Sequence, residues 1–261
     1  VDTTGQAGST YATGNVTNID KLAPKTFTPK VTAKTTNSIT VDGTTTDATA
    51  TADNASSGIK EYRFSKDGGS TYTAYQTSNI YTFEKLTQNK NYTIKVEARD
   101  KAGNTTVGTA SMTTGTISAA SGATCSPTTW TNGNVKVTLP AKSGFTTVYT
   151  KDGSTPTKSS TKYTSVFEVS SNCKINYLYT DGTNIGGAGT LNISIIDKKA
   201  PTAPTITNSS NGNWTYQDIK ITLSSSDSGS GIAKYQFKYS GTNNEWKDVE
   251  NNPDTWRAER N

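Results

Sequence analysis

The sequence predicts an all-β protein built from several small antiparallel β-sandwiches in series. Three observations support this fold class: a composition rich in threonine, serine, asparagine and glycine, short stretches in which apolar and polar residues alternate, and the recurrence of these stretches along the chain. Threonine is β-branched and suits a pleated strand, and alternation with a period of two places one face of a strand against a core. No stretch shows the periodicity of an amphipathic helix.

The length and the low hydrophobic content indicate more than one unit, each with a thin core. The chain has 261 residues, whereas a domain typically has about 150. Hydrophobic residues make up 31% of the chain, below the roughly 45–50% of ordinary globular domains. Disorder is disfavoured because aromatic residues reach 9% and recur inside the alternating stretches.

Two repeats mark the linkers and the early strands. The motif IDKLAP at 19–24 recurs as IDKKAP at 196–201, about two sandwich lengths later, and its Ala-Pro pair suits a domain boundary. WTNGNVKVTL at 130–139 recurs as WTYQDIKITL at 214–223, one sandwich length later. Each copy of this second repeat predicts a half-buried strand. The shared position of its tryptophan predicts a core or core-edge role for Trp130 and Trp214.

Further repeats predict the strands and turns that follow. SGIKEYRF at 57–64 and SGIAKYQF at 230–237 each follow an acidic turn, at Asp53 and Asp227, and each begins a strand. DG pairs after two strands predict hairpin turns, because glycine accepts a positive φ; they begin at Asp67 and Asp152. Late strands with alternating inward residues precede DKAGN and DGTN turns; the inward residues are Tyr92, Ile94, Val96 and Ala98, and Cys173, Ile175, Tyr177 and Tyr179.

These repeats divide the chain into four parts. We expect a terminal strand of a preceding sandwich, two full sandwiches and an incomplete one, in residues 1–20, 21–117, 118–198 and 199–261. The chain is therefore expected to be a fragment of a longer protein. In the last part, Trp246 and Trp256 are expected to pack against residues beyond Asn261.

Residues 21–117 resemble a fibronectin type III or immunoglobulin-like domain. The resemblance rests on Leu86 and on Tyr92, six residues later, within LTQNKNYTIKVEARD. This spacing is typical of the tyrosine corner of such domains. The resemblance implies that the Tyr92 hydroxyl bonds to a nearby backbone group and that its role is structural.

Residues 140–184, with VYTKDGSTPTKSSTKYT at 148–164, resemble the small sandwich module at the C-terminus of chitobiases. That resemblance implies an accessory or spacer role without hydrolysis. Cys173 departs from the fibronectin pattern, since it occupies the position of Tyr92. Residues 199–261 resemble bacterial immunoglobulin-like repeats that carry an SGI turn. Arrays of these families are typical of bacterial surface proteins, and related modules decorate phage tails and capsids.

The residues for catalysis are missing from the sequence. The chain contains no histidine, which excludes Ser/His/Asp and Cys/His catalysis and imidazole zinc ligands. The glutamates that a glycosidase would need lie singly and share no pattern; they include Glu84, Glu97, Glu168 and Glu245. We therefore predict that the chain is not an enzyme and has no catalytic residue and no cofactor.

The charge pattern and hydropathy limit the partners. A net charge of +5 is spread singly along the chain, whereas a nucleic-acid binder would concentrate it. No apolar stretch reaches the roughly 18–20 residues of a membrane span. The prediction is a protein that binds no nucleic acid and has no membrane span in this segment.

Cysteine and aspartate offer two weaker candidate sites. Cys125 and Cys173 fall in the same predicted sandwich, where they form either one disulfide or two buried thiols. Aspartates in turns lack the spacing of a strong calcium site and are interpreted as caps that bond their own backbone; these are Asp53, Asp100, Asp181 and Asp227. No metal site is predicted, and no spacing identifies a Lys-Asn isopeptide pair.

Exposed aromatic residues could form a stacking face for sugars. The candidates are Tyr72, Tyr75 and Tyr81 as one face, and Trp246 and Trp256 as another. The alternative is that these rings fill cores or pair across strands.

The function predicted from the sequence is structural. The chain is expected to be a non-catalytic, extracellular stalk, spacer or adhesin segment of a bacterial surface protein, with host or cell-wall glycans or surface proteins as partners. The alternatives are a carbohydrate-binding accessory module and an immunoglobulin-like decoration or tail component of a phage virion.

Overall fold

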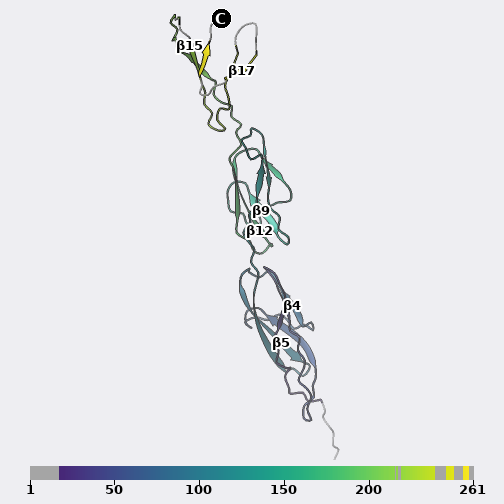
Figure 1. The fold of residues 1–261 in the computed structure, drawn as a ribbon. Helices are drawn as coiled ribbons and strands as arrows, with labels where there is room; N and C mark the ends of the chain where they lie inside the picture. The colour runs from purple at the N-terminus through teal and green to yellow at the C-terminus, as the bar shows by residue number, and fades with distance from the viewer. Residues whose placement is uncertain (1–17, 215, 217–218, 239–244, 250–254, 259–261) are drawn as a thin grey trace, which may run out of the picture.

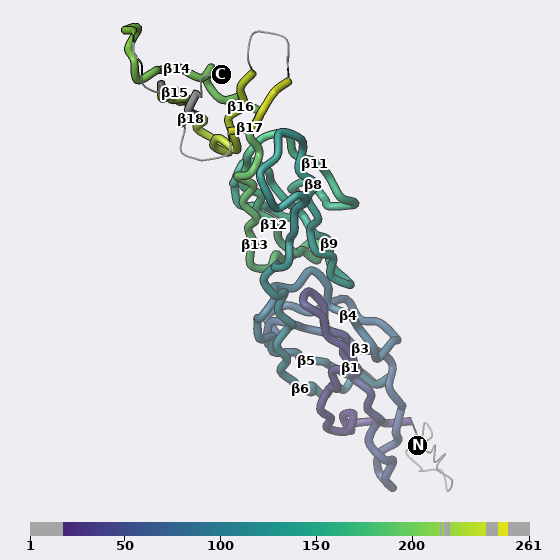
Figure 2. The backbone as a smooth tube through the Cα atoms, turned by 45° about the horizontal axis from the view of Figure 1, so that its top comes forward, coloured from purple at the N-terminus to yellow at the C-terminus, as the bar shows by residue number. Residues whose placement is uncertain are grey.

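The computed structural model describes residues 18–214, 216, 219–238, 245–249 and 255–258. Every regular element in these residues is a strand, and none of the described residues forms a helix long and apolar enough to cross a membrane. Three units of strands follow one another end to end along one axis (Figure 1). A view turned by 45° shows the same succession (Figure 2).

The first sandwich pairs two three-stranded antiparallel sheets. One sheet has the order β1 (Lys30–Lys34), β2 (Ile39–Asp42) and β4 (Ile80–Phe83). The other has the order β3 (Ile59–Ser65), β5 (Asn91–Asp100) and β6 (Thr105–Thr113).

The second sandwich repeats this strand order and adds one edge strand. One sheet has the order β11 (Phe167–Val169), β8 (Val135–Thr138) and β7 (Thr124–Ser126). The other has the order β10 (Thr161–Lys162), β9 (Thr146–Thr150), β12 (Cys173–Thr180) and β13 (Gly189–Ile193). The first, second and fifth strands of this sandwich share one sheet and the remaining strands share the other, which is the fibronectin type III-like arrangement. The predicted fold class is therefore confirmed.

In the third unit, the structure describes two antiparallel sheets. β14 (Thr205–Asn208), β15 (Ile219–Ser224) and β18 (Thr255–Ala258) form one. β16 (Gln236–Phe237) and β17 (Lys247–Asp248) form the other. The division of the chain at residues 20, 117 and 198 stays a prediction, as does the completeness of each part.

The alternating residues form the cores that the sequence predicts. Tyr92 is 8% exposed, and Ile94, Val96 and Ala98 are fully buried. In the second sandwich, the buried cluster contains Val135, Val137, Leu139, Ile175, Tyr177 and Tyr179. Each core consists of a few side chains from two facing sheets, as expected from the low hydrophobic content.

The interpretation of the two repeated tryptophans is wrong. Trp130 is 50% exposed and Trp214 is fully exposed. The reason is that neither ring lies on a strand: β8 begins only at Val135 and β15 only at Ile219. The repeat therefore marks the loop that leads into the strand, and the apolar residues after it form the core.

The DG turns have the backbone conformation that the sequence predicts. Gly68 has a φ of +72° and Gly153 a φ of +78°. The turn at Asp152 begins the longer loop, residues 151–160, that joins the paired strands β9 and β10. After the turn at Asp67, the chain returns beside β3, where Gln76 forms an antiparallel bridge with Tyr62.

The Tyr92 hydroxyl accepts a hydrogen bond of 2.9 Å from the Thr87 backbone N–H, and Leu86 is buried beside this corner. Tyr92→Phe is expected to lower the free energy of unfolding of the first sandwich by about 1 kcal/mol, because one hydrogen bond is lost without loss of the ring. Urea denaturation measures the change. Tyr81→Phe is the matched control, since the Tyr81 hydroxyl has no hydrogen-bond partner among the described residues and its removal should change little. Equal effects of the two substitutions would contradict the prediction.

Candidate functional site

The junction between the first and second sandwiches is closed by side-chain hydrogen bonds from both sides. The Thr36 hydroxyl donates to Asp181 Oδ2 at 2.5 Å. The Asn184 side-chain amide donates to the Leu86 carbonyl at 2.9 Å and to the Thr36 carbonyl at 3.3 Å. In return, the Gln88 backbone N–H donates to Asn184 Oδ1 at 3.1 Å. The turn after β12 therefore docks onto the end of the first sandwich.

Gln88 ties the linker into the same junction. Its side-chain Nε2 donates to the Ile185 carbonyl of the second sandwich at 2.7 Å. Its Oε1 accepts from the Ile117 N–H, in the segment between the sandwiches, at 2.7 Å. One side chain thus connects the first sandwich, the linker and the second sandwich.

The Asp181 turn is pre-organised for this contact. Asp181 Oδ1 accepts hydrogen bonds from the backbone N–H groups of Thr183 at 2.8 Å and Asn184 at 2.7 Å. Burial alone would raise the pKa of Asp181, but these backbone donors and the Thr36 hydroxyl outweigh it, and the pKa is lowered. The carboxylate is therefore ionised at neutral pH and accepts the hydroxyl of the neighbouring sandwich.

The same turn recurs at the opposite end of the first sandwich. Asp100 Oδ1 accepts from the N–H groups of Gly103 at 2.7 Å and Asn104 at 2.9 Å. The Asn104 side-chain amide donates to the carbonyls of Leu22 at 3.2 Å and Asp20 at 3.3 Å. In both sandwiches, the asparagine of this turn holds the chain or the sandwich that comes before it.

The repeated linker motif forms a second type of contact. Asp20 Oδ2 accepts from the Ser57 N–H at 2.8 Å. Asp197 Oδ2 accepts from the Ser230 N–H at 2.7 Å and from the Ser230 hydroxyl at 2.9 Å. The aspartate of each IDK linker therefore caps the SGI turn of the unit that follows. The sequence contains both repeats in the same order, with the two contact residues 37 apart in the first copy and 33 apart in the second, and that joint recurrence was the signal for a contact between them.

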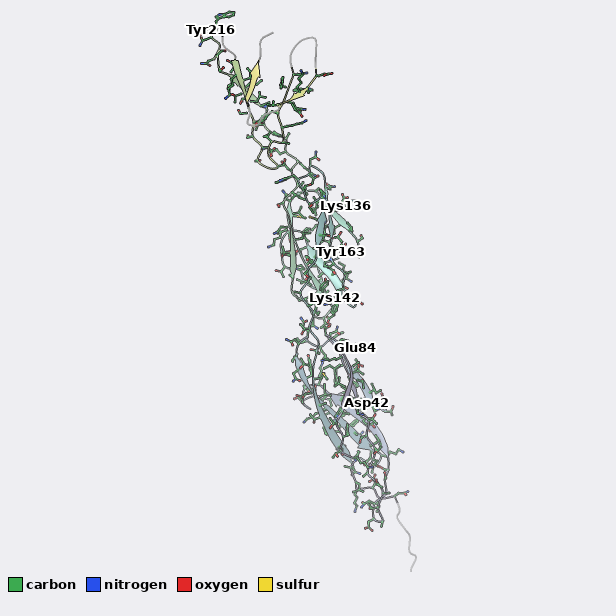
Figure 3. The ribbon with its side chains drawn as sticks, viewed as in Figure 1. Asp42, Glu84, Lys136, Lys142, Tyr163 and Tyr216 are labelled. Atoms are coloured by element: carbon green, nitrogen blue, oxygen red, sulfur yellow. The ribbon has the colours of Figure 1, made fainter. Side chains whose placement is uncertain are left out.

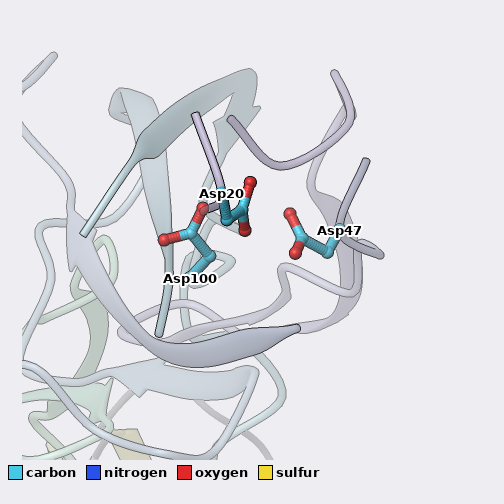
Figure 4. Close-up of side chains that lie close together, drawn as sticks. All are labelled: Asp20, Asp47 and Asp100. Atoms are coloured by element: carbon cyan, nitrogen blue, oxygen red, sulfur yellow. The ribbon is translucent and has the colours of Figure 1, made fainter. Parts of the chain in front are cut away.

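An acidic cluster lies beside the first of these linkers. One carboxylate oxygen from each of Asp20, Asp47 and Asp100 lies within 4.8 Å of the others (Figure 4). Such oxygens can ligate calcium. Here each carboxylate accepts hydrogen bonds from protein groups; Asp47 Oδ2 accepts from the Gly58 N–H at 2.7 Å. This is the capping role predicted for turn aspartates, although Asp20 and Asp47, rather than Asp53, cap this SGI turn.

Tyr72 and Tyr75 contact guanidinium groups of the first sandwich. The Arg63 guanidinium carbon lies 4.5 Å from the centre of the Tyr72 ring and 4.9 Å from that of Tyr75. Arg99 lies 3.8 Å from the Tyr75 ring centre, and the Tyr75 hydroxyl donates to Glu97. A sugar-stacking role for these two tyrosines stays a prediction, with only the ring surface that the arginines leave open available to a ligand.

Trp246 belongs to the third unit and is 61% exposed. The Lys238 ammonium lies 5.2 Å from the centre of its ring. Trp246 lines an apolar hollow of about 390 Å³ together with Ile206, Leu223 and Tyr235. Its role as a ligand contact also stays a prediction, and the side chain of Trp256 lies outside the described residues.

Cys125 and Cys173 are free thiols in the structure, and both are half-buried. They lie on strands of different sheets, β7 and β12, and pack against the same core. Burial raises the pKa of Cys173, and the charge of Lys151 opposes that shift. The disulfide stays a prediction that intact mass with and without reductant would test.

Comparison with known proteins assigns the second sandwich. Residues 126–189 match the family model of the chitobiase/beta-hexosaminidase C-terminal domain. The predicted resemblance is confirmed. The part of the chain that resembles this C-terminal domain is therefore the second sandwich, which follows the first sandwich directly.

Solved structures similar to the chain include an enzyme and fibronectin type III arrays. Chitinase ChiA74 from Bacillus thuringiensis is 23% identical over 54% of this chain and 19% of its own, with a TM-score of 0.30. A two-domain fibronectin type III segment of chicken tenascin is 14% identical over 65% and 98%, with a TM-score of 0.31. The central fibronectin III array of RIM-binding protein is 12% identical over 79% and 81%, with a TM-score of 0.28.

The matched part of this chain covers only about a fifth of the length of the chitinase. No curated protein matches the sequence.

Proposed function

We propose that the chain is a non-catalytic spacer segment of an extracellular bacterial surface protein, in which sandwiches in series hold a binding module away from the cell. The observation that carries this proposal is the hydrogen-bonded junction of Thr36 and Gln88 with Asp181 and Asn184. The end-to-end succession of the units supports it (Figure 1).

The physical basis is that bending at this junction breaks several contacts at once. Each hydrogen bond contributes about 0.5–1.5 kcal/mol, and those to a charged carboxylate contribute more. On the second sandwich, the contact residues all lie in one turn. On the first sandwich, they lie in two separate loops, one around Thr36 and one around Gln88. A connection through two loops resists both bending and twisting, as a load-bearing spacer requires.

Removal of the Asn184 amide is expected to loosen this junction. Asn184→Ala loses the bonds to the Leu86 and Thr36 carbonyls and the acceptor for the Gln88 N–H. Small-angle X-ray scattering of the variant chain should require a broader range of shapes than the wild type, with an unchanged melting temperature of the second core. Asn192→Ala is the control, because Asn192 is exposed on β13 of the same sandwich. Identical scattering of Asn184→Ala and wild type would count against the proposal.

A second candidate function is carbohydrate binding by an accessory module. The observation that favours it is the match of residues 126–189 to a domain of chitobiases and hexosaminidases. In this case the partners are cell-wall or host glycans. The two functions are compatible, because a spacer can also hold its protein against a polysaccharide.

A further inference from the structure

The described surface contains hollows that differ in how far their polar groups are already hydrogen-bonded within the protein. The hollow beside Trp246 is lined mainly by apolar side chains. A hollow of about 480 Å³ at the first junction has polar groups that bind one another, such as Thr35 with Ser38 and Thr36 with Asp181. A third hollow, of about 650 Å³, lies on the second sandwich between the two ends of the loop that joins β9 and β10. Its lining retains polar atoms that are available to a ligand.

We propose that this third hollow, called here the β9–β10 hollow, binds a neutral oligosaccharide. It is lined by Tyr149 to Asp152 and by Ser159 to Thr161. The proposal rests on the second candidate function above, for which it names a site.

The polar atoms of the hollow are only partly used by the protein. Among the described residues, the hydroxyls of Ser159 and Thr161 make no side-chain hydrogen bond, and Lys151 makes no ion pair. Asp152 uses one oxygen, Oδ1, for the Ser154 N–H at 3.0 Å and the Ser154 hydroxyl at 2.6 Å. Its second oxygen is left as an acceptor. The Lys151 ammonium already lies 4.6 Å from the centre of the Phe167 ring. The hollow thus offers two hydroxyls and a carboxylate oxygen, which match the hydroxyls of a sugar.

One aromatic residue, Tyr149, lines the same hollow, and two further rings that pack against the core support it from behind. The ring of Tyr149 stacks on Phe167, with centres 4.6 Å apart and an angle of 9° between the planes. Tyr163 meets Phe167 edge-on at 6.3 Å, and all three rings are only partly buried. Tyr163 lies at the middle of the second unit (Figure 3). Aromatic rings beside hydrogen-bonding groups are the usual composition of a small-molecule site.

The balance of charge favours a neutral glycan over other ligands. Lys151 and Asp152 give the lining one positive and one negative charge, whereas a nucleic acid needs a concentrated positive surface. An apolar peptide would need an apolar core to its interface, and four of the seven lining residues are Ser or Thr. A polyhydroxylated chain matches both the hydroxyl groups of the lining and its one aromatic residue, Tyr149.

The test is titration of the full chain with chitohexaose and, in parallel, cellohexaose, followed by NMR chemical shifts and calorimetry. Shifts are expected at the lining residues with at least one of the two sugars. Thr161→Arg and Ser159→Arg fill the hollow with a long charged side chain and should each weaken binding by about tenfold or more, equivalent to 1.4 kcal/mol. Both positions are exposed, so the core is preserved. Thr138→Arg, exposed on β8 of the other sheet, is the matched control and should bind like wild type.

The outcomes separate this site from the broader functions. Absence of shifts with both sugars, or equal affinity of Thr161→Arg and wild type, would overturn the assignment. Binding that is lost on Trp246→Ala and kept in Thr161→Arg would move the site to the third unit and also overturn it, while preserving carbohydrate binding. The scattering test of the junction does not depend on any of these results.

Discussion

Phe64→Ala is expected to lower the free energy of unfolding of the first sandwich by about 3–5 kcal/mol, the usual cost of a large cavity. Phe64 is 1% exposed and stacks on Tyr81 with ring centres 5.3 Å apart. The core around it is small, so few neighbours can move in to fill the space. Since a domain is stable by about 5–15 kcal/mol, this loss removes much of the stability.

Calorimetry of the whole chain measures this effect and locates it. The second core contains no residue of the first, so the transition of the second sandwich should remain close to its wild-type temperature. Val107→Ala, at a position that is 45% exposed on β6 of the first sandwich, is the control and should shift the first transition much less. If Phe64→Ala moved every transition equally, the sandwiches would not be separate folding units.

Glu97→Ala is expected to cost the first sandwich about 1.5–3 kcal/mol for each charged hydrogen bond that is lost without replacement. Glu97 is 8% exposed. It accepts Arg63 Nε at 3.0 Å and Arg63 Nη2 at 2.8 Å, and also the Tyr75 hydroxyl. Its removal leaves the Arg63 guanidinium and the Tyr75 hydroxyl without this acceptor. Glu84→Gln, at an exposed position, is the control for loss of a carboxylate and should have little effect.

The stabilisation by Glu97 should depend on pH in a defined direction. Burial alone would raise the pKa of Glu97, but the hydrogen bonds from Arg63 and Tyr75 outweigh it, so the folded pKa is lowered. A lowered pKa stabilises the fold above the unfolded value of about 4.3 and loses that effect as the pH falls through the folded value. The difference in unfolding free energy between wild type and Glu97→Gln should therefore be large at neutral pH and shrink in acid. A difference that is constant with pH would contradict this assignment.

Local sequence was sufficient to predict the strands and the cores. Alternation from Tyr92 to Ala98 fixes which side chains face inward, because adjacent residues of a strand point to opposite faces. The tendency of glycine for positive φ fixes the DG turns, as at Gly68 and Gly153. Both arguments depend on neighbours in sequence.

The contacts between units could not be predicted in this way. Thr36 and Asp181 are 145 residues apart in the sequence. No local pattern distinguishes this threonine from the many others in the chain. The exposure of Trp214 was also missed, because a shared repeat position does not show whether the ring lies on the strand or in the loop before it. The sequence suggested an exposed stacking face at Tyr72 and Tyr75. In the fold, the Arg63 guanidinium lies against both rings, and no local pattern indicates this contact.

The most direct test of the spacer proposal is measurement of residual dipolar couplings for backbone amides of the full chain in a weakly aligned medium. A stiff junction at Asp181 and Asn184 predicts that couplings from the first and second sandwiches fit one alignment tensor, with the relative orientation shown in Figure 2. Two tensors of different magnitude would show that the sandwiches reorient independently, and would contradict a rigid spacer.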